Sequence, residues 1–99
     1  MINFMRTALI APGKTGDALA FANQVAKHIK EKYGTTLELL MPIGGNPGRI
    51  AWTSRYQSLG EWETLSAKLL ADSEYLGLIA KNAGTFLPGS VHDELWRTI

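Results

Sequence analysis

The segment TTLELLMPIGGNPGRIAWTSRY, residues 35–56, indicates the fold class because it holds two strand-like runs on either side of one turn. Leucine dominates residues 35–43, and apolar residues alternate with polar or small ones over residues 49–56. Between the two runs, GGNPG at residues 44–48 combines the residue types that favour tight turns. The pattern predicts two consecutive antiparallel strands joined by a hairpin.

Helix and strand patterns on both sides of this hairpin complete the predicted topology. Apolar residues recur at three- and four-residue steps from Leu19 to Tyr33, which indicates a helix that ends at Gly34. Asp72-Ser73-Glu74 is typical of a helix cap, so the second helical region divides there. The predicted elements are strands at residues 3–11, 35–43, 49–56 and 92–99, a helix at 15–33, a helix opening at Ser58 or Gly60, and a second helical piece from Asp72 to about Ala83.

The order β-α-β-β-α-β predicts an α+β protein with the ferredoxin-like plan, an antiparallel sheet with its helices on one face. Residues 1–99 are expected to form one such domain. Large apolar side chains occur at both parities of the first two strands, as with Leu39 and Leu40. Because an apolar second face needs a cover, we expect a homodimer that pairs sheet to sheet.

Three stretches resemble the NIPSNAP family: GRIAWTSRYQSL at residues 48–59, Glu61-Trp62, and ADSEY at residues 71–75. That family belongs to the dimeric α/β-barrel superfamily, in which two ferredoxin-like sheets face each other. The resemblance therefore implies the fold and the dimer. It implies no defined reaction, because the superfamily includes cofactor-independent oxygenases, haem-degrading enzymes, isomerases and ligand-binding regulators.

Composition excludes several classes of function. The chain has 99 residues, a formal net charge of +1 and no cysteine. A nearly neutral chain lacks the basic stripe that nucleic-acid binding needs, and without cysteine there is no disulfide or thiolate chemistry. No signal peptide and no apolar run of about 20 residues is visible, so we expect no membrane span and a cytoplasmic location.

Two features of the sequence resemble cofactor-binding or metal-binding motifs but depart from them. The stretch ALIAPGKT, residues 8–15, resembles a phosphate loop, but Ala8 replaces its first glycine and Pro12 removes a backbone donor. His28 and His92 have no partner at a metal-binding spacing, and no histidine lies in residues 60–83, where a haem ligand is expected. We therefore expect no metal and no cofactor, with His28 exposed to solvent.

An aromatic and basic set supplies the candidate ligand-binding residues. Tryptophan and tyrosine can wall an apolar cavity, and an arginine at its rim can bind a carboxylate or carbonyl group. Simple core packing is the alternative role for the tryptophans. If the last strand shares the inward parity of the third, one pocket lies between sheet and helices, walled by Trp52, Tyr56, Trp62 and Trp96 with His92 near one end. The same parity points Glu94 into this pocket. Because a buried carboxylate is costly unless it is paired, Glu94 is then either a functional acid or a sign that this face is the outer one. The candidates are Trp52, Arg55, Tyr56, Trp62, His92 and Trp96, with Arg49 also in the set.

Two function classes remain open, and the catalytic residues are unknown at this point. The first is a NIPSNAP-like homodimer that binds a small hydrophobic ligand or a protein partner. The second is a cofactor-independent oxygenase or isomerase acting on an aromatic or lipid-like carbonyl compound, with His92 or Tyr56 handling a proton. The first is favoured because the sequence shows no evident acid–base pair.

Overall fold

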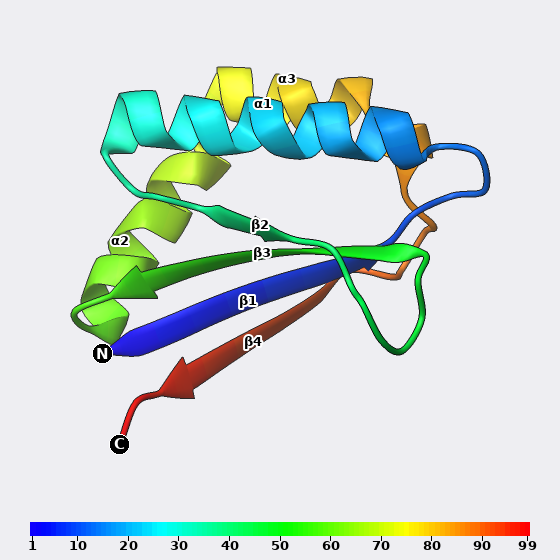
Figure 1. The fold of residues 1–99 in the computed structure, drawn as a ribbon. Helices are drawn as coiled ribbons and strands as arrows, with labels where there is room; N and C mark the ends of the chain where they lie inside the picture. Colours follow the sequence, from blue (N-terminus) through cyan, green and yellow to red (C-terminus); the bar gives the residue numbers. More distant parts are fainter.

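Helices pack over one face of a four-stranded antiparallel sheet (Figure 1), in a computed structural model that describes residues 1–99. The strand order is β2-β3-β1-β4, so the first strand of the chain lies in the middle of the sheet. The predicted ferredoxin-like α+β fold is confirmed. The elements are β1 (Ile2–Leu9), α1 (Thr15–Tyr33), β2 (Glu38–Leu40), β3 (Arg49–Tyr56), α2 (Leu59–Leu70), α3 (Ser73–Lys81), the 3-10 turn η1 (Ala83–Thr85) and β4 (His92–Arg97).

Helix α1 has the bounds that its apolar spacing predicts. It buries Ala18, Ala22, Val25 and Ile29, which recur at three- and four-residue steps along one face. Gly34 ends the helix in a left-handed conformation, with φ of 73°, and its N–H donates to the Lys30 carbonyl. The chain is thereby turned from the helix layer towards the sheet.

The second helical region divides at Asp72, as the cap motif predicts. The Asp72 carboxylate accepts hydrogen bonds from the backbone N–H groups of Glu74 and Tyr75, which begins α3. The preceding helix, α2, begins in the same manner, with the Ser58 hydroxyl accepting from the N–H of Glu61. The second piece ends at Lys81, two residues earlier than predicted, because the chain tightens there into η1.

The outer strands are shorter than predicted. The expected strand at residues 35–43 is reduced to Glu38–Leu40, because Pro42 cannot donate to a ladder and β2 pairs on one side only. The predicted hairpin itself is confirmed, since Leu39 pairs antiparallel with Trp52. The first strand ends at Leu9, beyond which Ile10 makes an isolated bridge to Phe86. Strand β4 stops at Arg97 rather than at residue 99.

The register of β1 against β3 places the core. Ile2 lies opposite Tyr56 and Ala8 opposite Ile50, so even-numbered residues of both strands face the helices. Those residues and the buried face of α1 form two apolar clusters beneath the helix layer. The buried hydrophobic residues are Ile2, Ala8, Ile10, Ala18, Ala22, Val25, Ile29, Ile50, Trp52, Tyr56, Leu65 and Tyr75.

The opposite face of the sheet, here called the outer face, is covered by no helix (Figure 1). It carries the odd-numbered residues of β1 and β3 and the even-numbered residues of β2 and β4. The expectation of an apolar second face is met only in part. Met5 and Leu40 alternate there with Asn3, Thr53 and other polar side chains. A cover for this face must therefore accommodate polar groups as well as apolar ones.

Strand β4 is the exposed edge of the sheet, and all six of its residues are exposed. Besides the backbone ladder, an ion pair joins it to β1: Arg6 Nε lies 2.7 Å from Asp93 Oδ1, and Arg6 Nη2 lies 2.8 Å from Asp93 Oδ2. This two-pronged contact with Asp93 raises the pKa of the Arg6 guanidinium. None of the helices combines the length and apolarity that crossing a bilayer requires.

Candidate functional site

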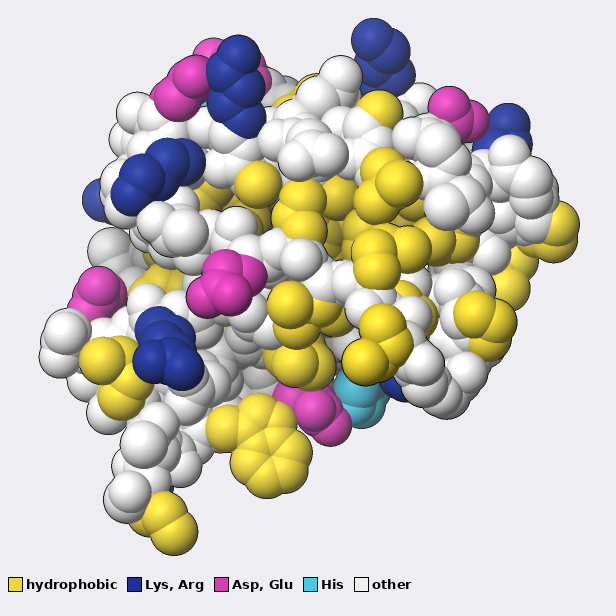
Figure 2. Space-filling model, in the orientation of Figure 1, with side chains coloured by type: hydrophobic (Ala, Val, Ile, Leu, Met, Phe, Trp, Pro, Cys, Tyr) yellow, Lys and Arg dark blue, Asp and Glu magenta, His cyan; other side chains and the backbone are white.

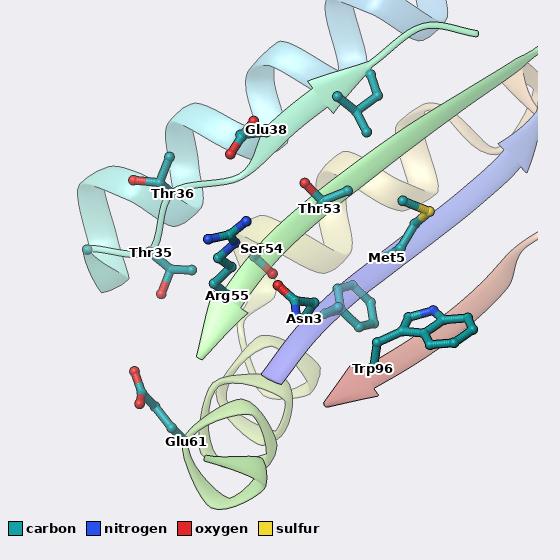
Figure 3. A pocket seen from close by; sticks show the side chains of 13 residues that line it. Asn3, Met5, Thr35, Thr36, Glu38, Thr53, Ser54, Arg55, Glu61 and Trp96 are labelled. Carbon is teal, nitrogen blue, oxygen red and sulfur yellow. The ribbon is translucent and has the colours of Figure 1, made fainter. Parts of the chain in front are cut away.

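A hollow of about 570 Å³ opens on the outer face, at the end of the sheet where β1 begins and β3 ends (Figure 3). It draws on all four strands, on the connection from α1 to β2, and on α2. Most of its lining is polar. The lining residues are Asn3, Phe4, Met5, Gly34, Thr35, Thr36, Glu38, Leu40, Thr53, Ser54, Arg55, Glu61 and Trp96.

The floor of the hollow follows directly from the strand register. Arg55 lies opposite Asn3, and Asn3 lies opposite Trp96, so these three residues form one row across β3, β1 and β4. The next row runs through Glu38, Thr53 and Met5. Since directly paired residues share a face of a sheet, all of these side chains leave the outer face together.

The rim of the hollow comes from the chain that follows α1. The turn at Gly34 brings Thr35 and Thr36 to the edge of the hollow, and Lys30 Nζ donates to Thr36 Oγ1 at 3.0 Å. On the other side, the first turn of α2 supplies Glu61, whose Oε2 accepts from the Gln57 backbone N–H at 3.0 Å. Hydroxyl and carboxylate oxygens therefore surround the arginine.

Charged side chains in the hollow are not neutralised by one another. Arg55 makes no ion pair within 4.0 Å, and neither do Glu38 and Glu61. The Arg55 side chain also has no hydrogen-bond partner in the protein. A guanidinium and two carboxylates without ion-pair partners are thus available to charged groups of a ligand.

A smaller apolar groove of about 240 Å³ adjoins the hollow and shares Met5 and Leu40 with it. The loop after β2 adds Met41 and Pro42, and Arg49 closes the groove at the far end of β3. Ile43 in the same loop is fully exposed. Hydrophobic side chains gather across the middle of the molecule in Figure 2, with charged side chains around them.

Three side chains of β4 form a hydrogen-bonded row on the outer face. Glu94 lies between its neighbours: its Oε2 is 3.4 Å from His92 Nε2, and its Oε1 accepts from Trp96 Nε1 at 3.3 Å. Of the two interpretations of Glu94, a functional acid inside a pocket or a sign that its face of β4 is the outer one, the structure supports the second. The pairing of Met5 with Glu94 puts this carboxylate on the outer face, where water and a ligand both have access.

The prediction of one pocket between sheet and helices is wrong, because the side chains expected to wall it are divided between the two faces. Those side chains are Trp52, Tyr56, Trp62 and Trp96, with His92 near one end. Trp52 lies on the helix face, in a row with Arg6 and Asp93, whereas Trp96 lies on the outer face. The helix face also holds Tyr56 and, from α2, the half-buried Trp62. Arg55 and His92 join Trp96 on the outer face, where only Arg55 and Trp96 line the hollow.

The three candidates on the helix face are packed into the core. Trp52 is 6% exposed and lies edge-on to Phe21 and Phe86, with ring centroids 6.3 and 5.9 Å away. Its indole N–H is buried without a hydrogen-bond partner. Burial raises the pKa of Tyr56, whose hydroxyl accepts a hydrogen bond from Ser54 Oγ at 2.9 Å. Tyr56 therefore holds its proton and has no access to the hollow.

Several residues of the hollow were not singled out from the sequence: Asn3, Thr35, Thr36, Glu38, Thr53 and Glu61. One signal for them is the parity of β3, where Arg49, Thr53 and Arg55 alternate with the buried residues. Polar residues on the outward parity of an otherwise apolar strand mark a face that meets water or a ligand. The threonines after Gly34 become relevant only once the turn places them beside that face.

His28 is not solvent-exposed, as the sequence suggested, but belongs to a second polar cluster on the helix side. Its Nε2 lies 2.8 Å from Asp72 Oδ2, which also accepts from the Tyr33 hydroxyl at 2.7 Å. Lys32 Nζ lies 3.3 Å from the same oxygen. These donors, with Tyr33 and then His28 foremost, hold the pKa of Asp72 well below its usual range. The cluster fastens α1 to α3, and no group of three or more His, Cys, Asp or Glu side chains is placed to hold a metal ion.

The fold and the uncovered sheet face define a ferredoxin-like α+β protein. No family model matches the sequence, and no curated protein matches it. Solved structures do share its fold. A NIPSNAP family protein of unknown function from Agrobacterium tumefaciens has a TM-score of 0.82 at 18% identity, over 99% of this chain and 87% of that chain. An uncharacterized NIPSNAP domain protein from Burkholderia xenovorans has a TM-score of 0.84 at 16% identity, over 100% of this chain and 95% of that chain.

A third structure with this fold comes from Deinococcus radiodurans and is named as a candidate antibiotic biosynthesis monooxygenase. Its TM-score is 0.74 at 13% identity, over 99% of this chain and 92% of that chain. The resemblance to NIPSNAP proteins is thus confirmed at the level of the fold. Proteins with more than one name share this architecture, so the fold alone does not select a reaction.

Proposed function

We propose that residues 1–99 form a single NIPSNAP-like domain that pairs through its outer sheet face and binds a small molecule in the hollow on that face. The observation that carries the proposal is a sheet with one face packed under helices and the other open, with a polar hollow in it. A sheet face that holds Met5, Leu40 and Ala51 gains stability when a partner covers it.

A second copy of the chain is the proposed cover. Two-fold pairing places the same face on both sides of the interface, so each protomer must supply complementary groups. The outer face does so, since it carries the cations Arg49 and Arg55 on β3 and the anion Glu94 on β4. Pairing of this kind closes the hollow between two sheets and shields its ligand from water. A cytoplasmic location remains a prediction from the sequence.

The ligand proposed for the hollow is amphipathic rather than purely hydrophobic. Only four of its 13 lining residues are hydrophobic, and a wholly apolar molecule would leave its charged and hydroxyl groups without partners. Met5, Leu40 and Trp96 offer an apolar surface beside the polar one. A different protein in place of the second copy is the other outcome, and it would be seen as a monomeric purified chain.

Light scattering with a matched pair of variants tests the pairing. Ala51 lies on the outer face between Leu40 and Thr7, and Ala80 is exposed on α3, so Ala51→Arg and Ala80→Arg differ in the surface they alter. We expect a dimer for the unmodified chain and for Ala80→Arg, and a monomer for Ala51→Arg. An interface of at least about 1,200 Å² is expected to hold at micromolar concentration. A monomer mass for the unmodified chain would refute sheet-to-sheet pairing.

A second candidate function is the cofactor-independent oxygenase or isomerase, and the contact between His92 and Glu94 favours it. An imidazole beside a carboxylate can take and return a proton, and both side chains lie on the outer face near the hollow. Tyr56 no longer supports this candidate because it is buried on the other face. Turnover of an aromatic carbonyl compound that is lost in His92→Gln and kept in His28→Gln would establish it.

A further inference from the structure

The charged residues of the hollow select a narrower class of ligand than an amphipathic molecule in general. We propose that the hollow binds a free α-amino acid with a large apolar side chain, held as its zwitterion. This inference rests on the proposed function, because it assumes that the hollow is a ligand site. It is carried by one unpaired guanidinium and two carboxylates without ion-pair partners, Arg55, Glu38 and Glu61, around the same space (Figure 3).

The register sets how far apart the ligand's two charged groups are bound. Glu38 lies opposite Thr53, which is two residues before Arg55 on the same strand and on the same face. Arg55 and Glu38 are therefore diagonal neighbours, roughly 7–8 Å apart at the backbone. Both side chains are long enough to reach one small molecule between them. A carboxylate on Arg55 and an ammonium on Glu38 fit that separation when both groups are on one carbon.

The second carboxylate explains why a simple acid is a poor ligand. Glu61 faces the hollow from α2, so carboxylates outnumber the guanidinium around it. A ligand with a carboxylate alone would form an ion pair with Arg55 but would be repelled by Glu38 and Glu61. An ammonium group on the same molecule turns that repulsion into attraction. The Thr35 hydroxyl can accept a remaining ammonium proton at the rim, whereas the Thr36 hydroxyl already accepts from Lys30.

The row across the sheet gives the direction of the ligand's side chain. Asn3 lies between Arg55 and Trp96, so Trp96 stands two strand spacings, roughly 9–10 Å, from Arg55. A side chain that leaves the charged end must cross β1 beside Met5 to reach the indole ring. Trp96 is 61% exposed, which leaves its ring available for contact. A long or aromatic apolar side chain spans this distance, and that of glycine or alanine does not.

Calorimetric titration with four compounds separates these contributions. L-Phenylalanine carries both charges and the ring, 3-phenylpropanoate lacks the amine, 2-phenylethylamine lacks the carboxylate, and glycine lacks the ring. We expect L-phenylalanine to bind at least about tenfold more tightly than each of the other three, because each lacks one contact of the proposed set. Equal binding of L-phenylalanine and 3-phenylpropanoate would overturn the assignment of a zwitterion.

Variants of exposed side chains identify the residues. Arg55→Gln should weaken the binding of L-phenylalanine at least about tenfold, so that L-phenylalanine no longer binds more tightly than 2-phenylethylamine. Glu38→Gln should make L-phenylalanine bind no more tightly than 3-phenylpropanoate. Arg97→Gln is the matched control, since Arg97 is an exposed arginine whose pairing with Ile2 puts it on the helix face and outside the hollow, and it should leave binding unchanged. Circular dichroism melting confirms that each variant is folded.

The outcomes distinguish this inference from the function on which it rests. Neutral N-phenyl-1-naphthylamine, whose fluorescence rises in an apolar site, serves as an independent probe of the hollow. If it binds in a Trp96-dependent manner and none of the charged compounds does, the amino-acid assignment is wrong and the ligand site stands. If neither it nor L-phenylalanine binds and the chain is monomeric in light scattering, both proposals are wrong.

Discussion

The carboxylate of Asp72 and the imidazole of His28 are joined by a contact of 2.8 Å, although 44 positions separate them in the sequence. The same carboxylate caps α3 through the backbone N–H groups of Glu74 and Tyr75. One side chain therefore starts a helix and fastens it to the end of another. The stability of the helix layer should be sensitive to the charge state of this single residue.

Asp72→Asn should lower the melting temperature at neutral pH by at least about 4 °C, because an amide keeps one oxygen for the helix cap but replaces the oxygen that accepts from three side chains with an NH2 donor. Folding lowers the pKa of Asp72 from its ordinary value of 3.8. Its stabilisation is therefore complete above about pH 4 and is lost as the pH falls towards the lower, folded value. Thermal melts of both proteins should converge in acid. Asp17→Asn, at an exposed carboxylate on α1, should show no such effect.

Tyr33→Phe should make the stability of the protein less dependent on pH at alkaline pH. The hydrogen bond to Asp72, together with burial, raises the pKa of Tyr33 above its ordinary value of 10.0. A raised pKa means that the folded state retains this proton more firmly, so its stabilisation is complete below pH 10 and declines above it. Denaturant unfolding followed from pH 8 to 11 should show a steeper loss for the unmodified chain than for Tyr33→Phe. Parallel curves would contradict the role given to this hydroxyl.

Two glycine substitutions should change the free energy of unfolding in opposite directions. Gly34 has φ of 73°, so Gly34→Ala forces a β-carbon into a left-handed conformation and should cost about 1 kcal/mol. Gly77 lies inside α3, and a β-carbon there would meet nothing within 4 Å, so Gly77→Ala should stabilise by about 0.5–1 kcal/mol. Chemical denaturation measures both. A stabilising Gly34→Ala would show that the turn into the rim of the hollow relaxes easily.

Alanine substitutions of the three tryptophans should rank by burial. Trp52→Ala should cost about 3–5 kcal/mol, because its ring is enclosed by Phe21 and Phe86. Trp62 is half-buried against Phe4, with ring centroids 6.0 Å apart, and Trp62→Ala should cost roughly 2 kcal/mol. Trp96→Ala should cost less than about 0.5 kcal/mol in the monomer. Any larger cost at Trp96 should increase with protein concentration, as linkage to a dimer requires.

The pair of Arg6 and Asp93 should contribute a small coupling energy between β1 and β4. Both side chains are partly exposed, at 38% and 41%, so solvent screens the pair despite its two-pronged geometry. A double-mutant cycle with Arg6→Gln and Asp93→Asn should give about 0.5–1 kcal/mol. The coupling should fall in high salt. A coupling near zero would mean that β4 is held by its backbone ladder alone.

Local signals predicted the helices and the hairpin well, because those elements depend on residues close in sequence. The bounds of α1 follow from apolar spacing and Gly34, and the start of α3 follows from Asp72. The bounds of β3 follow from alternation after the GGNPG turn. In each case the interactions that fix the element lie within one or two turns of chain.

The candidate site was predicted poorly because it depends on register between distant strands. In β4, His92, Glu94 and Trp96 share one parity, and the charge of Glu94 is the one local sign that this parity faces away from the helices. The pairing of Asn3 with Trp96 settles it, and a shift of one residue would have produced the expected pocket. The contact of His28 with Asp72 was missed for a similar reason, since it joins two helices that pack only in the folded protein.

The central place of β1 has a consequence for how the protein forms during synthesis. Its two neighbours in the sheet are β3 and β4, so its second ladder needs residues 92–97, which leave the ribosome some 90 residues after β1 itself. Until then one edge of β1 has no strand paired to it, and Arg6 has no ion pair with Asp93. The native sheet is therefore completed by its most distant pairing in sequence, which predicts slow closure and a nascent chain prone to pair its open edge with other strands.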